Sequence, residues 1–135
     1  MRILFLIVAL FFPALAFAEP IYLACEVCSE SNESDQKKFE IKLDEDSGKI
    51  THSRGKGSAF NAEGFFAIDT ISYQDISNMG NVRITYQYKI DRNSLEVTET
   101  FIVGPSDPKF LLEIPPKTII KKGSCHIIEV KKRKI

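Results

Sequence analysis

The stretch that decides the fold is Val82 to Val103, VRITYQYKIDRNSLEVTETFIV. A period of two over its first limb, rich in β-branched and aromatic side chains, is typical of a half-buried strand. Residues 91–94 supply turn chemistry, and the chain returns through a second apolar limb. The stretch therefore predicts an antiparallel hairpin in an all-β fold. Its core face would carry Val82, Ile84, Tyr86, Tyr88 and Ile90, and then Val97, Phe101 and Val103.

Shorter alternating runs on both sides extend this pattern. Strands are expected at 21–27, 39–43, 49–53, 59–69 with a break at Gly64, 71–73, and 118–130 with a kink or bulge near Gly123. Residues 29–38 are polar and predict a solvated loop, and residues 77–81 predict a turn. No window has a convincing helical period. The prediction is an antiparallel meander of about seven to nine short strands, closed or half-closed as a barrel, with a β-sandwich as the alternative.

The first eighteen residues have the form of an export signal. Arg2 is followed by an apolar run and by Ala16-Phe17-Ala18, a small-x-small cleavage site. No later segment approaches the roughly 20 apolar residues of a membrane-spanning helix. We expect a signal peptide at 1–18, a single β domain at 19–130 and a basic tail at 131–135, with the protein periplasmic or secreted and without a membrane span after cleavage.

Charge is uneven along the expected mature chain. Residues 19–69 carry six Lys/Arg against eleven Asp/Glu, and residues 70–135 carry eleven against seven. The resulting net charge, −1, argues against bulk attraction to nucleic acid or to an anionic membrane, so no nucleic-acid partner is expected. The asymmetry instead favours attraction between the two halves of one domain.

Two turns in the chain share their chemistry. Residues 41–52, IKLDEDSGKITH, align with residues 88–99, YKIDRNSLEVTE, with four identities. In each, an aspartate begins the turn and a later residue is forced toward left-handed geometry. That residue is Gly48 in the first turn. In the second it is Leu95, unless Asn93 takes the strain, which for a leucine costs on the order of 1 kcal/mol or more.

Three cysteines, Cys25, Cys28 and Cys125, remain after the signal. In an exported chain they predict one disulfide and one odd thiol. The preferred pairing is Cys25–Cys125, which would join the first strand to the last and leave Cys28 unpaired. Cys28–Cys125 and Cys25–Cys28 remain alternatives.

Other chemistries are poorly supported by the residue patterns. The Cys25-x-x-Cys28 spacing lacks the helix N-terminus that dithiol redox catalysis uses, and a zinc site that adds Cys125 and His126 would need a bulge. His52 and His126 have no nucleophile motif beside them and read as ordinary strand residues. We therefore expect no catalytic residue, no metal and no cofactor.

A set of short motifs carries a resemblance. Cys25 lies in the opening strand, Ile90-Asp91-Arg92 precedes a turn, and Gly123-Ser124-Cys125 comes near the end. This layout resembles a loose group of small exported bacterial all-β proteins of unknown function, in which an early cysteine, I-D-R-x-S-G turns and a closing G-x-C recur. The resemblance implies the fold and a disulfide. Leu95 stands where that pattern has glycine, and Cys28 is an additional thiol.

Two functions fit these observations. The first is a non-enzymatic interaction module that binds a protein or polymer in the periplasm or at the cell surface. The second is a carrier with a small apolar ligand inside the barrel. An interior cavity of about 300 Å³ or more would favour the carrier, whereas a filled interior with an exposed apolar patch would favour the module. The residues expected to line such a cavity are Phe60, Phe65, Phe66, Tyr86 and Tyr88.

Overall fold

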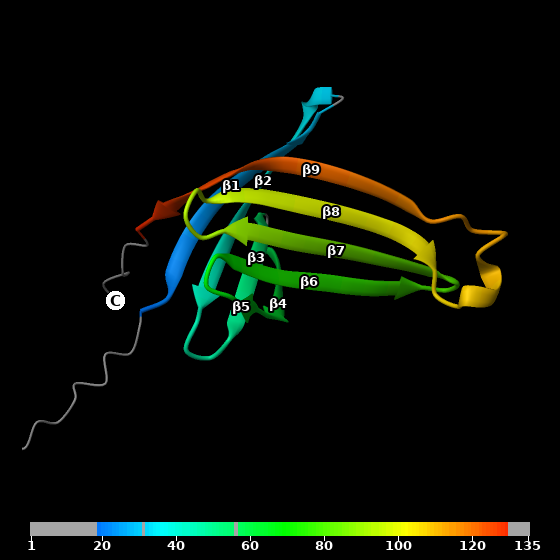
Figure 1. Ribbon diagram of the computed structural model, residues 1–135, viewed down its shortest axis with the longest axis horizontal. Coiled ribbons are helices and arrows are strands. Elements are labelled where there is room, and N and C mark those ends of the chain that lie inside the picture. The colour runs from blue at the N-terminus through cyan, green and yellow to red at the C-terminus, as the bar shows by residue number, and fades with distance from the viewer. Residues whose placement is uncertain (1–18, 31, 56, 130–135) are drawn as a thin grey trace, which may run out of the picture.

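The computed structural model describes residues 19–30, 32–55 and 57–129. Their strands form one antiparallel sheet in the order β4-β3-β2-β1-β9-β8-β7-β6-β5, which curls into a nearly closed barrel (Figure 1). The predicted all-β barrel is confirmed. The predicted signal peptide and basic tail lie outside the described residues. The elements are β1 (Ile21–Ser29), β2 (Asn32–Asp44), β3 (Lys49–Gly55), β4 (Ser58–Glu63), β5 (Phe65–Phe66), β6 (Thr70–Met79), β7 (Val82–Asp91), β8 (Glu96–Pro105), the 3-10 helix η1 (Pro108–Phe110) and β9 (Lys117–Ile128).

The predicted hairpin of residues 82–103 is the β7–β8 pair. Tyr88 lies directly opposite Glu99 on β8 and opposite Tyr73 on β6. Its turn closes with the Leu95 amide donating to the Asp91 carbonyl over 2.9 Å. The hairpin is therefore in the register that its alternating pattern predicts.

The strand β1 joins the two halves of the sheet, because it pairs with β2 on one side and with β9 on the other. Cys25 and Cys125 are direct partners across β1 and β9, with Cα atoms 4.0 Å apart. The register runs without a shift through Gly123, so the predicted bulge there is wrong. A side chain at Gly123 would run into the backbone of Glu26 and Val27, which explains the glycine.

Among the described residues, two ion pairs connect strands that are not neighbours in the sheet. β4 lies near β6 without being its neighbour in the sheet. Arg54 from β3 pairs with Asp75 from β6 over 3.1 Å. Lys37 from β2 pairs with Glu99 from β8 over 2.9 Å. Both pairs connect strands that are far apart in the sheet order.

The strands β6 to β9 continue past the barrel as a four-stranded arm (Figure 1). β1 pairs with β9 only from residue 121 onward, so the remainder of β9 and its neighbours has no sheet facing it. Consequently Tyr88 and Ile90 are buried, whereas Val82, Ile84 and Tyr86 are only partly buried. The prediction that all five residues are core holds for the barrel half of β7 alone.

Two segments expected to be irregular are strands. The predicted loop at 29–38 is a hairpin, with Val27 opposite Lys37 and Ser29 opposite Asn32. The predicted turn at 77–81 begins too early, because β6 continues to Met79. Both segments extend beyond the core, where strands can pair through their backbones without apolar side chains. Their polar composition therefore predicted a loop and a turn instead of strands.

Candidate functional site

The middle of the barrel is filled by stacked rings. His52 is completely buried between Phe39 and Phe60, with ring centroids 4.5 Å and 4.7 Å away and nearly parallel planes. Tyr73 and Tyr88 stack beside them at 4.9 Å. Alternation along β2, β3, β4, β6 and β7 points all five side chains inward. This aromatic layer leaves little space at the centre.

Burial sets the ionisation of the histidine in this layer. The atoms Nδ1 of His52 and Oη of Tyr73 are 2.7 Å apart and share a hydrogen bond. Nε2 has no hydrogen-bond partner among the described residues. Burial, followed by the nearby charges of Arg54 and Lys37, lowers the pKa of His52 to about 3. The ring is therefore neutral at neutral pH.

A layer of charged residues lies next to the aromatic layer. Glu99 is 2% exposed and accepts from Lys37. The Tyr88 hydroxyl lies near Glu99 and Arg54 without a hydrogen bond of normal geometry, and burial raises the pKa of this phenol. Burial opposes charge on Arg54, but its bond to Asp75 raises the pKa of the guanidinium. These groups neutralise one another and aim no free acid, base or nucleophile at a cavity.

The structure brings together some of the residues expected to line a ligand cavity. Phe60 and Tyr88 belong to the aromatic layer, where they contact other rings. Tyr86 contacts Phe101 and lies under the Lys37 ammonium. Phe65 is 72% exposed, and it lines an open surface hollow of about 640 Å³ to which Tyr88 also contributes. The five residues thus do not line one enclosed cavity, although Phe65 and Tyr88 share this surface hollow.

Phe66 contributes to a different space, an apolar hollow of about 220 Å³. It opens at the end of the barrel where β1 begins and β9 ends, below the aromatic layer. Ile21 and Ile127 form its exposed lip. The apolar residues that line it are Ile21, Leu23, Leu43, Phe66, Ile71, Ile90, Leu95 and Ile127.

Charged residues line the hollow too. The Arg92 guanidinium donates to both carboxylate oxygens of Glu45, over 3.1 Å and 2.9 Å, and to the Ala67 carbonyl. Glu19 is the third charged residue of the lining. Because Arg92 is paired, the lining offers no unpaired cation among the described residues.

Leu95 reaches the hollow in a strained conformation. Its φ is 61°, and it is the single non-glycine residue with positive φ in the part of the chain that the structure describes. This confirms that Leu95, and not Asn93, takes the left-handed position. Its side chain is partly buried, packs against the core and lines the hollow. The sequence predicted the turn but not the hollow, because Leu43, Ile71 and Leu95 lie in separate turns and strands and come together only in the folded barrel.

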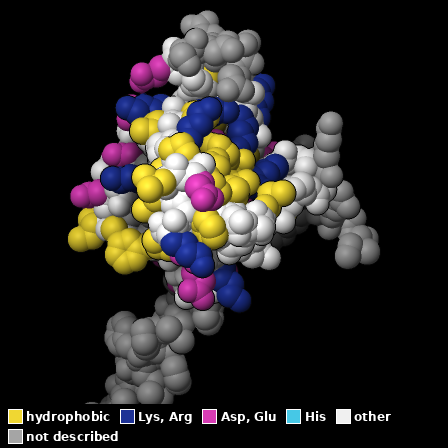
Figure 2. All heavy atoms as spheres, turned by 90° about the vertical axis from the view of Figure 1, so that its right-hand side faces the viewer, with side chains coloured by type: hydrophobic (Ala, Val, Ile, Leu, Met, Phe, Trp, Pro, Cys, Tyr) yellow, Lys and Arg dark blue, Asp and Glu magenta, His cyan; other side chains and the backbone are white. Residues whose placement is uncertain are grey.

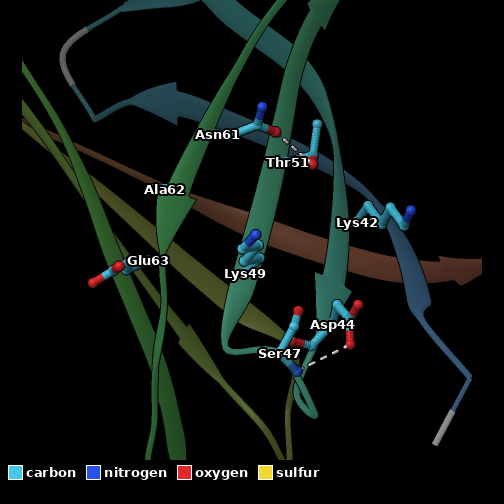
Figure 3. Close-up of a pocket in the computed structure, with 8 residues that line it drawn as sticks. All are labelled: Lys42, Asp44, Ser47, Lys49, Thr51, Asn61, Ala62 and Glu63. Carbon is cyan, nitrogen blue, oxygen red and sulfur yellow. Dashed lines mark hydrogen bonds between the residues drawn. The ribbon is translucent and has the colours of Figure 1, made fainter.

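A second hollow, on the outer face of β2 to β4, is polar (Figure 3). Thr51 donates to Asn61 over 2.8 Å, and the Ser47 amide donates to Asp44. The other charged side chains spread along the strands instead of converging on one point, as Figure 3 shows. Its lining is charge-balanced and resembles an ordinary solvated sheet face.

The cysteines are arranged as the preferred prediction has them. Cys25 and Cys125 form a disulfide, and Cys28 is free and partly buried. Cys28 lies on the opposite face of β1 from Cys25, because it is an odd number of positions away. The disulfide takes two of the four residues considered for zinc and one of the two considered for redox catalysis.

In comparisons with known proteins, no protein-family model matches the chain, and no curated protein or solved structure gives a significant match. Within residues 19–30, 32–55 and 57–129, no helix is both long and apolar enough to cross a membrane. Inferences about function therefore rest on the geometry alone.

Proposed function

We propose that the protein is an exported, non-enzymatic interaction module that binds a protein or polymer in the periplasm or at the cell surface. The observation that carries this proposal is the filled interior. His52 and Tyr88 are 0% and 1% exposed and lie in continuous ring contacts, so the barrel centre has no room for a ligand. We therefore place the binding site on the outer surface.

The end of the four-stranded arm offers an apolar surface. Hydrophobic side chains gather near the centre of this face, with both basic and acidic side chains among and around them (Figure 2). Met79, at the end of β6, is 66% exposed, and Leu111 and Leu112, just after η1, are 49% and 100% exposed. Exposed apolar side chains with a charged rim are typical of protein interaction sites.

A free strand edge lies on the same arm. β6 has β7 on one side and only the two-residue β5 on the other, so residues 73–79 have no ladder partner there within the described sheet. Gln74 and all residues from Ile76 to Met79 are exposed. An unpaired edge of this kind accepts an extended segment of another chain.

Site-specific cross-linking in the native host tests this proposal. A photoreactive residue at Leu112 should give a discrete adduct of defined mass, and one at Lys42, on the outer face of β2, should not. Equal adducts at both positions, or none at Leu112, would contradict the proposal. Mass spectrometry of the same sample should find the N-terminus at Glu19, as export predicts.

A second candidate, the small apolar-ligand carrier, is favoured by the hollow at the barrel end. Its volume, about 220 Å³, is below the roughly 300 Å³ at which drug-sized pockets begin. A ligand would therefore insert one chain and leave its remainder outside. This differs from a ligand enclosed among Tyr86 and Tyr88.

A further inference from the structure

We infer that the hollow at the barrel end binds a single straight alkyl chain. This inference rests on the carrier candidate and is independent of any protein partner. Three observations carry it: the size of the hollow, the chemistry of its lining, and the strained residue in its wall.

Size sets the length of the chain. A methylene group has about the volume of a water molecule in the liquid, roughly 30 Å³. The 220 Å³ of the hollow therefore accept about seven methylene groups in single file. The lip residues Ile21 and Ile127 are 47% and 64% exposed, so an inserted chain would cover apolar surface that now contacts water.

The lining favours an apolar ligand. Eight of its eleven residues are apolar and offer no side-chain hydrogen bond, and the other three are Glu19, Glu45 and Arg92. Arg92 is already bonded to Glu45. The charges of Arg92 and Glu45 thus offset each other, and the part of a ligand that inserts among the apolar residues should itself be apolar.

The wall of the hollow contains Leu95, whose backbone conformation is unfavourable for a leucine. A leucine with φ of 61° costs on the order of 1 kcal/mol, and glycine at this turn position would avoid that cost. The turn at Gly48 avoids it with the same backbone conformation. Leucine differs from glycine here by supplying an apolar side chain to the hollow. A binding role accounts for a side chain that the turn itself does not need.

The test is an NMR titration of the full-length chain with normal alcohols from butanol to decanol. Saturable amide shifts should appear around Leu23, Ile71, Ile90 and Leu95. Affinity should rise about four-fold per carbon up to about seven carbons and then level off.

A matched pair of variants locates the site. Ile21→Trp fills the mouth and should lower octanol affinity at least ten-fold, whereas Ile120→Trp should not change it. Ile120 is 51% exposed, close to the 47% of Ile21, and does not line the hollow. Leu95→Gly enlarges the hollow and should move the limiting chain length upward by about four carbons, the size of the lost side chain.

Several outcomes would overturn the inference. These are absence of saturable shifts near the hollow, affinity that keeps rising through decanol, or equal effects of the two tryptophan variants. Binding to phosphatidylcholine vesicles without alcohol binding would point to a membrane surface and would overturn it too. None of these results depends on cross-linking at Leu112, so the interaction proposal fails or stands separately.

Discussion

The β2–β3 and β7–β8 hairpins have similar turns that differ in their closing hydrogen bond and in the residue at the left-handed position. The Gly48 amide donates to the Glu45 carbonyl in the first turn, and the Leu95 amide donates to the Asp91 carbonyl in the second. Asp44 accepts from the amide three residues on, and Asp91 accepts from the amides two and three residues on. These amides, first that of Ser94, lower the pKa of Asp91. The positive φ falls on Gly48 at 70° and on Leu95 at 61°.

The two left-handed residues also make equivalent contacts. The Gly48 carbonyl accepts from the Gly64 amide over 2.7 Å, and the Leu95 carbonyl accepts from the Cys125 amide over 2.8 Å. Each turn is thereby tied to another part of the sheet, the first to the Gly64 link between β4 and β5 and the second to β9. The difference is that the strand holding the Leu95 turn carries the disulfide.

The correspondence continues inward along the strands. Aligned positions are buried in both hairpins, namely Ile41 and Tyr88, Leu43 and Ile90, Ile50 and Val97, and His52 and Glu99. The last pair places an ionisable residue at the same depth, and the two are accommodated differently. Glu99 is paired with Lys37, whereas His52 is stacked between rings and kept neutral. Similar turns thus set burial positions without setting the chemistry placed there.

The largest expected effect comes from removing the disulfide that holds one turn. Replacing Cys25 and Cys125 together by alanine should lower the free energy of unfolding by about 2–4 kcal/mol, because the bridge spans 100 residues. Hydrogen exchange should speed up more at the residue 125 amide than at the Gly64 amide. Cys28→Ala is the control and should leave both unchanged. Equal loss of protection at the two amides would show that the disulfide does not anchor the second turn.

The next prediction concerns the loss of stability in acid that the buried, neutral His52 should cause. The folded pKa of His52 is about 3, below its ordinary 6.5, so the unfolded chain binds the extra proton between these values. Stability is complete above pH 6.5 and should fall by about 1.4 kcal/mol per pH unit below it. Urea unfolding at pH 7.5 and 4.5 should therefore differ by about 2.7 kcal/mol.

The variant His52→Phe provides the control for that measurement. A phenyl ring keeps the stacking with Phe39 and Phe60 but cannot bind a proton. Its unfolding free energy should lose most of the dependence on pH in this window. An unchanged dependence would show that His52 is not the source of the acid sensitivity.

A smaller effect is expected from Gly48→Leu, which makes the first turn resemble the second. A side chain at Gly48 would meet no atom within 4 Å, so the cost is that of the left-handed backbone alone. The free energy of unfolding should fall by about 1–2 kcal/mol. Gly48→Asn should cost less, because asparagine tolerates this conformation. An unchanged melting temperature for Gly48→Leu would mean that the turn tolerates leucine without strain.

These turns also show what the sequence was able to predict. Alternation and turn residues sufficed for the hairpins and for Leu95 at the left-handed position, because both are local properties. The hollow was not predictable, since Leu43, Phe66 and Ile127 meet only through barrel closure. Glu99 was a nearer miss: it shares a face with Val97 and Phe101, so alternation alone places it inward. Its partner Lys37 lies in a stretch whose polar composition suggested a loop.

The smallest net effect on stability is expected at Leu95. It is also the most direct test of how the two turns differ. Leu95→Ala removes a partly buried side chain and keeps the strain, so it should cost about 1 kcal/mol. Leu95→Gly removes the same contacts but relieves about 1 kcal/mol of backbone strain, so it should be neutral or slightly stabilising. Thermal unfolding of both variants measures the difference. If glycine is no better than alanine, the leucine is not strained, and if glycine causes a clear loss, packing of this side chain outweighs the strain of its turn.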